Sequence, residues 1–347
     1  MARSPMKRTL LTILQIVVTV LLLCWIFRDP AKREQMATAL HTANFLWLIP
    51  GALAIGTAFA LQTQRWRILL AAQGISMGWW RAMRIFLIGA FFNLFLPGGT
   101  GGDVVKIFYA MKETKDRKSA AFLSVLVDRM MGLLGLVAVA ATLCTLEFNL
   151  LFSKPITQAL MGSLGIILGG SLTFIVAGFL VDYFRLAHKL PTWLPLHAKI
   201  IEFASAFSTY ARSPKTLLAT FGISIPSHLL MFLAFYFAAR AFGLFGGFEG
   251  LVDVFAVLPA IMTVASLPVS LSGLGVREGL FQQVFSELFN TPIGTAAMIS
   301  MTGFAMIVFW GLVGGVIYML FRPAGGIHIR EVEQEVDKVE KTIEDAA

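Results

Sequence analysis

The stretch that decides the fold lies at residues 85–106 and reads IFLIGAFFNLFLPGGTGGDVVK. Its apolar part, Ile85–Leu96, is too short to cross a bilayer, because about 20 helical residues are needed to span about 30 Å of hydrocarbon. The residues that end it are a proline and four glycines: Pro97, Gly98, Gly99, Gly101 and Gly102. Such breaks are tolerated at membrane depth only where protein or a wet cavity satisfies the backbone. We therefore predict a re-entrant segment over about residues 85–106.

A second broken segment occurs far along the chain, where residues 251–278 read LVDVFAVLPAIMTVASLPVSLSGLGVRE. Two prolines interrupt it, and the glycines Gly273 and Gly275 stand just before Arg277 and Glu278. We predict that residues 251–289 form a second re-entrant segment. Paired broken helices in inverted halves are the best sequence indication of a transporter's midplane site. Three predicted crossings separate the two segments, so we expect them to open to opposite faces.

Composition identifies the class of protein. Of the 347 residues, 57% are hydrophobic and 14% are charged, and the mean hydropathy is +0.77. Soluble domains contain about 45–50% apolar residues even when glycine is counted. The chain is therefore an integral membrane protein, and a soluble enzyme is excluded.

The apolar runs predict an all-α polytopic membrane protein with about six full transmembrane helices. The expected crossings are residues 10–27, 45–63, 119–146, 158–181, 217–240 and 293–321. No small-x-small cleavage motif follows the first run, so we expect it to be uncleaved. Two small-xxx-small faces, at Gly165/Gly169 and Gly311/Gly315, are expected to pack against other helices. Residues 1–322 would form the transmembrane domain, and residues 323–347 a charged tail with a short amphipathic helix.

The net charge of +8 has a simple explanation in this setting. Most of the 28 basic residues fall in predicted loops on the side of the N-terminus, and cytoplasmic loops are enriched in lysine and arginine. We therefore expect cytoplasmic N- and C-termini in a prokaryotic plasma membrane, and no nucleic-acid partner.

Charged residues at membrane depth are the candidate functional residues. Asp128 and Arg129 lie within an apolar run, where each costs about 2.5–3.5 kcal/mol on insertion scales. Adjacent helical residues point about 100° apart, so each needs a partner elsewhere. The available partners are Asp103, Lys106, Arg277 and Glu278. A structural ion network and a binding site for an anionic lipid headgroup both fit this pattern.

Other chemistry finds little support in the sequence. Cys24 and Cys144 lie in apolar runs without nearby metal-ligating partners, so neither a disulfide framework nor a metal site is expected. No catalytic motif is present, the glycines complete no P-loop, and we expect no cofactor. His228 lies in a predicted span, where we expect a helix-packing hydrogen bond.

Three stretches together resemble a known family: Asn93–Lys106, Asp128-Arg129 and Leu271–Gly279. They are similar to the transmembrane region of lysylphosphatidylglycerol synthases, the flippase-domain family of the multiple peptide resistance factors. The resemblance covers roughly residues 10–322 and implies that the three stretches line a lipid path. It implies a stand-alone member, because residues 323–347 are too few for a soluble aminoacyl-transfer domain.

The expected function is therefore a membrane lipid translocase that moves an anionic phospholipid or a lipid-linked anion between leaflets. The expected partner is a membrane lipid, with a homo-oligomer or a lipid-modifying enzyme as further partners. Two alternatives remain open. One is a membrane component of lysylphosphatidylglycerol or aminoacyl-lipid synthesis, and the other is a non-transporting scaffold for a lipid- or glycan-modifying enzyme.

Overall fold

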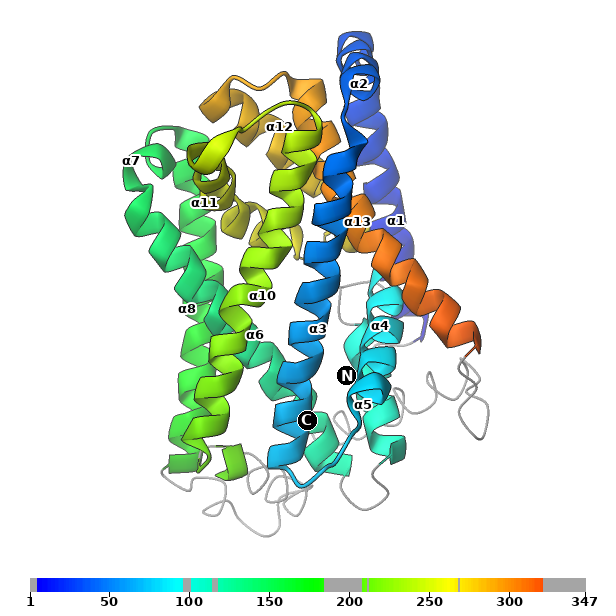
Figure 1. The fold of residues 1–347 in the computed structure, drawn as a ribbon, viewed down its shortest axis with the longest axis vertical. Coiled ribbons are helices and arrows are strands. Elements are labelled where there is room, and N and C mark those ends of the chain that lie inside the picture. The colour runs from blue at the N-terminus through cyan, green and yellow to red at the C-terminus, as the bar shows by residue number, and fades with distance from the viewer. Residues whose placement is uncertain are drawn as a thin grey trace.

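The computed structural model describes residues 5–95, 101–113, 118–183, 208–210, 212–267 and 269–320, which are helical apart from short connections (Figure 1). The longer elements are α1 (Pro5–Phe27), α2 (Pro30–Thr42), α3 (Leu48–Ala72), α4 (Trp79–Phe95), α5 (Gly101–Glu113), α6 (Lys118–Leu146), α8 (Pro155–Tyr183), α10 (Pro214–Ala241), α11 (Gly247–Ala265), α12 (Val276–Phe289) and α13 (Ile293–Leu320). Short helices, η1 (Phe45–Trp47), α7 (Phe148–Leu151) and η4 (Leu271–Gly273), connect some of them. The predicted Pro97, Gly98 and Gly99, and the predicted tail at 323–347, lie outside the described residues.

Within the described part of the chain, six helices are long and apolar enough to cross a membrane. They are Phe45–Ala72, Ser119–Leu146, Pro155–Thr173, Pro214–Ala241, Gly247–Ala265 and Ile293–Leu320. The predicted all-helical, multi-pass architecture is confirmed. These six helices differ from the six predicted crossings at one position. They include α11, which was predicted as part of a re-entrant segment, and they do not include the first predicted crossing at residues 10–27.

The first predicted crossing, residues 10–27, is part of a bent pair. Helix α1 meets α2 at an angle of 83°. The bend follows from the sequence Asp29-Pro30, because a proline disfavours the helical conformation in the residue before it. The Asp29 carboxylate then caps the new helix by accepting a hydrogen bond from Ala31 N at 3.0 Å.

Helix α3 differs most from its predicted crossing. The sequence predicts an end at residue 63, but the helix continues to Ala72. This extension buries Arg65 and Trp66, which the prediction had placed in a loop. The ends of the other four crossings lie within a few residues of the predicted ones.

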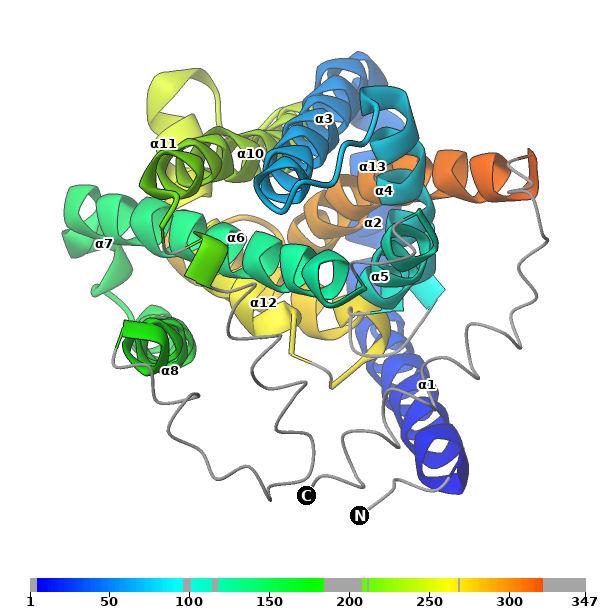
Figure 2. The same cartoon turned by 90° about the horizontal axis from the view of Figure 1, so that it is seen from below.

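Small residues allow close helix packing, which is the main source of helix association in membranes. A Cβ added to Gly315 would lie 2.7 Å from the Phe91 ring of α4, and Gly311 contacts Leu94 on the same helix. The packing face predicted there is confirmed. For the part of the chain that the structure describes, the prediction for Gly165 and Gly169 is wrong, because a Cβ at either would meet none of those atoms within 4 Å. Both lie on α8, at the periphery of the helix bundle (Figure 2).

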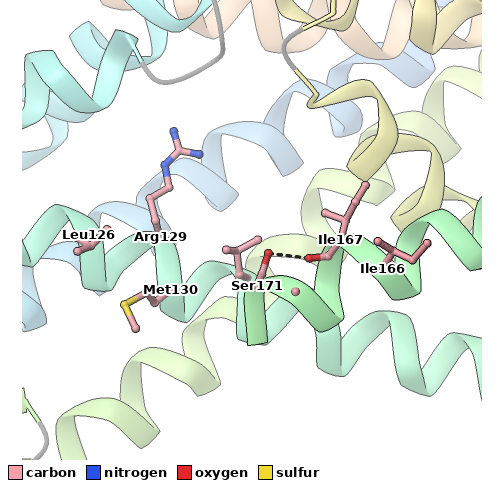
Figure 3. Close-up of a pocket in the computed structure, with 8 residues that line it drawn as sticks. Leu126, Arg129, Met130, Ile166, Ile167 and Ser171 are labelled. Carbon is pink, nitrogen blue, oxygen red and sulfur yellow. Dashed lines mark hydrogen bonds between the residues drawn. The ribbon is translucent and has the colours of Figure 1, made fainter. Parts of the chain in front are cut away.

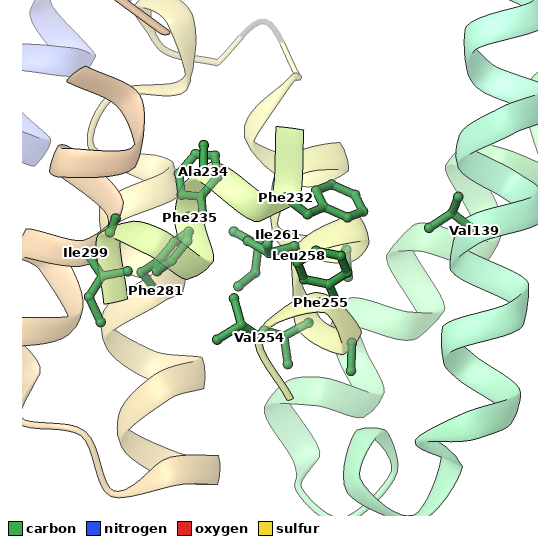
Figure 4. Close-up of a cluster of buried hydrophobic side chains, with 14 of the residues drawn as sticks. Val139, Phe232, Ala234, Phe235, Val254, Phe255, Leu258, Ile261, Phe281 and Ile299 are labelled. Atoms are coloured by element: carbon green, nitrogen blue, oxygen red, sulfur yellow. The ribbon is translucent and has the colours of Figure 1, made fainter. Parts of the chain in front are cut away.

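The largest buried cluster among the described residues includes phenylalanines and aliphatic side chains of α10, α11 and α12 (Figure 4). Phe281 and Phe285 on α12 stack with ring centroids 4.8 Å apart, and Phe235 of α10 lies 5.7 Å from Phe281. This packing fixes α12 against α10, and thereby the turn that precedes α12.

The two broken segments form two helix pairs, α4 with α5 and α11 with α12. The first pair lies in the lower half of Figure 1 and the second in the upper half. The re-entrant character of these pairs, and their inverted relation, stay a prediction.

Candidate functional site

The two broken segments touch each other. The hydroxyl of Ser272, in η4, lies 3.1 Å from the carbonyl oxygen of Asn93 and 3.0 Å from that of Leu94. Both carbonyls belong to the last turn of α4, where helical carbonyls lack an intrahelical partner. We call this hydrogen bonding the tip contact. It joins the break after α4 to the break before α12.

The backbone at each break depends on glycine. Gly273 and Gly275 have φ angles of 74° and 85°, in the left-handed region that favours glycine. A Cβ on Gly273 would also lie 2.6 Å from the carbonyl oxygen of Ala265. In the first segment, the Gly102 amide donates to the side-chain oxygen of Asn93 at 2.7 Å, and a Cβ on Gly89 would lie 2.9 Å from the Gly102 carbonyl oxygen. Among the predicted glycines, Gly102, Gly273 and Gly275 are therefore required by the local geometry.

Beside the first break lies a buried network of three charges, which we call the buried triad: Arg65 of α3, Lys106 of α5 and Asp128 of α6. Arg65 Nε donates to Asp128 Oδ1 at 2.7 Å, and Lys106 Nζ donates to Asp128 Oδ2 at 3.1 Å. All three side chains are at most 7% exposed. One carboxylate thus serves two cations, and the triad carries a formal charge of +1.

The two cations of the buried triad have further contacts. Arg65 Nη1 donates to the Ser224 hydroxyl of α10 at 2.9 Å. Lys106 Nζ lies 4.9 Å from the centroid of the Trp66 ring and 5.0 Å from that of Phe86. Aromatic faces attract a desolvated cation, so these rings partly replace the water that Lys106 lacks. The hydrogen bonds of this network connect four helices, α3, α5, α6 and α10.

Arg129 has a different partner from its neighbour Asp128. Its Nε donates to the carboxylate of Asp103, which lies in the first turn of α5. An acidic residue in that position is favoured by the helix dipole. The Arg129 side chain is 49% exposed, in contrast to the cations of the buried triad. The prediction that Asp128 and Arg129 find separate partners elsewhere is confirmed.

The second break is followed by a buried ion pair between Arg277 and Glu278. Arg277 Nη2 donates to Glu278 Oε1 at 2.7 Å, and Ser300 of α13 donates to the same oxygen at 3.0 Å. Glu278 Oε2 accepts from the amide of Gly275 at 2.6 Å and so caps α12. The Arg277 guanidinium lies 4.0 Å from the centroid of the Phe304 ring. The sequence offers Arg277 as a candidate partner of Asp128, and the structure instead pairs it with Glu278.

Two further polar groups lie near the buried triad. His228 Nε2 lies 2.9 Å from the Gly132 carbonyl oxygen, which confirms the expected packing hydrogen bond. Outside the spans, Tyr210 donates to the Leu69 carbonyl oxygen at 2.9 Å. Burial raises the pKa of the Tyr210 hydroxyl above its ordinary value, so this group stays protonated and holds its segment to the end of α3.

Sequence reasoning missed three members of these networks: Arg65, Ser224 and Ser300. Arg65 is the one with a detectable signal, because the apolar periodicity of α3 continues beyond residue 63 and places Arg65 within the helix. The two serines lie in apolar helices, where their side chains carry no sequence pattern that marks a partner. Among the described residues, no group of three or more histidine, cysteine, aspartate or glutamate side chains could hold a metal ion.

Comparisons with known proteins show which family the chain matches. A comparison with curated proteins found no match. Residues 12–314 match the family described as the lysylphosphatidylglycerol synthase TM region, a match that covers nearly the whole chain and includes every helix break and charge network described above. The chain belongs to the lysylphosphatidylglycerol synthase TM region family.

Proposed function

We propose that this multi-pass membrane protein is a lipid translocase, which moves an anionic phospholipid or a lipid-linked anion between leaflets. The observation that carries the proposal is the tip contact, where two helix breaks meet beside buried charges. Each break is followed by a helix whose first two turns carry ionisable residues, Asp103 and Lys106 in α5 and Arg277 and Glu278 in α12.

Broken helices suit a polar path through a membrane. Irregular backbone at membrane depth is found where it is buried in protein or lines a water-filled cavity. In transporters, pairs of discontinuous helices meet near the bilayer midplane, and their half-helix ends face the transported group. The α4–α5 and α11–α12 pairs support the same arrangement here, with α4–α5 opening to the cytoplasm and α11–α12 to the opposite face.

The charge of the buried triad favours an anionic headgroup. Arg65 and Lys106 share the one carboxylate of Asp128, which leaves an excess of one positive charge. An unneutralised buried charge is costly, and an anion that approaches the triad lowers that cost. A cationic headgroup would raise it. In this proposal the path passes Lys106 and Arg129, while the Arg277–Glu278 pair holds the second turn in place.

The protein reconstituted in liposomes provides the test. Fluorescent phosphatidylglycerol, phosphatidylcholine and lysylphosphatidylglycerol are compared, and a membrane-impermeant quencher reports the fraction of each in the outer leaflet over time. We expect faster leaflet exchange than in protein-free liposomes, with phosphatidylglycerol exchanging faster than the other two. Exchange at the protein-free rate for all three, or faster exchange of lysylphosphatidylglycerol, would overturn the proposal.

A matched pair of variants isolates the charge of the triad. Lys106→Met removes the excess positive charge, and we expect it to reduce the preference for phosphatidylglycerol over phosphatidylcholine. Lys215→Met removes an exposed lysine at the start of α10 and should leave the preference unchanged. Lys106→Arg keeps the charge and should keep the preference. Equal preferences in Lys106→Met and the wild type, with both proteins monodisperse, would contradict the role of the triad.

A further inference from the structure

Helix α1 is attached to the rest of the protein along one narrow stripe. Gln15, Thr19, Leu22 and Ile26 recur at every third or fourth position and therefore share one helix face. Of these, Gln15, Thr19 and Ile26 are at most 7% exposed, whereas Leu21 on another face is 63% exposed. The main contacts of α1 are with α2, η4 and α12. Figure 2 shows α1 at the rim of the bundle, leading away from it.

This stripe places one polar side chain of α1 on the second break. The backbone amide of Leu271, the first residue of η4, donates to the Thr19 hydroxyl oxygen at 2.8 Å. The Thr19 hydroxyl donates in turn to the Gln15 carbonyl oxygen at 2.7 Å, so its own helix fixes its orientation. One turn further along α1, a Cβ added to Gly275 would overlap Leu22. Helix α1 therefore lies directly against the turn that precedes α12.

The accepted hydrogen bond distinguishes Thr19 from an ordinary helical hydroxyl. Serine and threonine often donate to the carbonyl four residues earlier. Ser171 of α8 does so to Ile167 at 2.8 Å, beside the cavity between α6 and α8, and no described residue donates to it (Figure 3). Thr19 instead serves a backbone amide of a distant segment. Because an amide without a partner is costly in a membrane, this contact holds α1 against the break.

A polar group next to this contact lacks a partner. The Ser270 side chain is 3% exposed, and its hydroxyl has no hydrogen-bond partner among the described residues. Buried polar groups normally have a partner, so this hydroxyl lowers the stability of the arrangement in which α1 is docked. The observed position of α1 is thus held by a single interhelical hydrogen bond, with an unsatisfied hydroxyl beside it.

The other end of α1 joins a fixed part of the protein. Helix α2 is bound to the start of α13, where the Gly294 amide donates to Gln35 Oε1 at 2.9 Å. A bend of 83° at Asp29 separates α2 from α1. Ile26, close to this bend, is fully buried in a cluster with residues of α2 and α13. At 1.5 Å per residue, Thr19 lies about 10 Å along α1 from Ile26. A rotation about the bend therefore displaces Thr19 far more than Ile26.

We propose that α1 is a hinged lateral gate over the second break, with the bend at Asp29 as its hinge and the hydrogen bond from the Leu271 amide to Thr19 as its latch. In the closed arrangement, α1 stands between the turn before α12 and the bilayer. When the gate opens, a headgroup oxygen or water accepts the hydrogen bond of the Leu271 amide. Thr19 is a positioning residue, because it acts through α1. The inference rests on the proposed function for its purpose, although the movement itself does not require transport.

The distance between two spin labels reports the gate directly. Nitroxides at Val17→Cys on α1 and Glu287→Cys on α12, both exposed positions, are measured by double electron–electron resonance. The full-length protein, with both native cysteines replaced by alanine, is reconstituted in liposomes of phosphatidylglycerol and phosphatidylcholine. We expect one dominant distance. Thr19→Val should add a second, longer distance, because the loss of the latch lowers the closed-to-open ratio about tenfold, or 1.4 kcal/mol.

Two variants serve as controls for the latch. Thr19→Ser keeps the acceptor oxygen and should keep the parent distribution of distances. Ser171→Ala removes a hydroxyl that bonds only within its own helix, and should also leave the distribution unchanged. The latch would be overturned by a parent-like distribution in Thr19→Val. It would equally be overturned if Thr19→Ser or Ser171→Ala opened the gate as far as Thr19→Val does.

A covalent lock connects the gate with lipid exchange. Leu22→Cys and Leu274→Cys are joined by a short bifunctional thiol reagent, which holds α1 against the turn. We expect leaflet exchange of phosphatidylglycerol to fall to the protein-free rate, while each single cysteine variant, treated in the same way, keeps its untreated rate. Undiminished exchange in the locked protein would refute the gate and leave the proposed function in place. An open population in Thr19→Val, in a protein without any lipid exchange, would leave the movement in place and refute the proposed function.

Discussion

Replacing Asp128 with asparagine removes the one carboxylate from the buried triad and keeps the shape of the side chain. Two charge-assisted hydrogen bonds are affected, from Arg65 at 2.7 Å and from Lys106 at 3.1 Å. Each such bond contributes about 1.5–3 kcal/mol, so their loss amounts to about 3–6 kcal/mol. That range agrees with the cost of about 3–5 kcal/mol for breaking a buried ion pair. We expect Asp128→Asn to lower the free energy of unfolding by about 3–5 kcal/mol.

A double variant tests whether the excess charge of the triad lowers the stability. Asp128→Asn raises the formal charge of the triad from +1 to +2, and adding Lys106→Met returns it to +1. The double variant should therefore be more stable than Asp128→Asn alone. An exposed acid on α12 provides the control, because Glu287→Gln should change the stability by about 0.5 kcal/mol or less.

Steric trapping in bicelles measures these free energies of unfolding without removing the protein from a bilayer-like environment. The reasoning would be refuted by a value for Asp128→Asn within 1 kcal/mol of the wild type. It would also be refuted by a double variant less stable than Asp128→Asn, since that order would mean that the excess charge is not what destabilises the protein.

Three further predictions follow from contacts at the two breaks. Arg277→Lys should lower the thermal unfolding midpoint in detergent, because lysine keeps the charge but loses the fork that binds Glu278; an unchanged midpoint would mean that the fork is dispensable. Ser272→Gly suits the local φ of 51° but removes the tip contact, so amide hydrogen exchange should become faster in peptides that cover residues 269–276, and equal rates would contradict this. Gly102→Val should abolish monodisperse protein, because its Cβ would overlap the Gly89 carbonyl, whereas Gly162→Val on α8 should not; similar yields of the two would argue against the close approach.

The class of fold and the location of the helix breaks could be predicted because they depend on local chemistry. Apolar runs identify spans, and glycine with proline marks places where a helix cannot continue. The charged partners were also predictable in part. Insertion cost requires a partner for each buried charge, and both Lys106 and Asp103 were among the candidates.

The remaining features depend on contacts between distant segments. The bend between α1 and α2 has a local signal in Asp29-Pro30, but its angle depends on packing. The extension of α3 places Arg65 beside Asp128 only because α6 lies next to it. Gly165 and Gly169 show the opposite failure, since their small-xxx-small pattern predicts a packing face, and yet no described residue packs against them on α8.

The tip contact also bears on leakage through the protein. Ser272 donates a hydrogen bond to carbonyls in the last turn of α4, where helical carbonyls lack an intrahelical partner. If the two tips separate in a dry interior, the freed polar groups cost about 1–3 kcal/mol each. Separation is therefore favourable only when water or a polar headgroup takes the place of the hydroxyl. In the proposed translocase an empty path would therefore close by itself, and the membrane would keep its permeability barrier between successive passages.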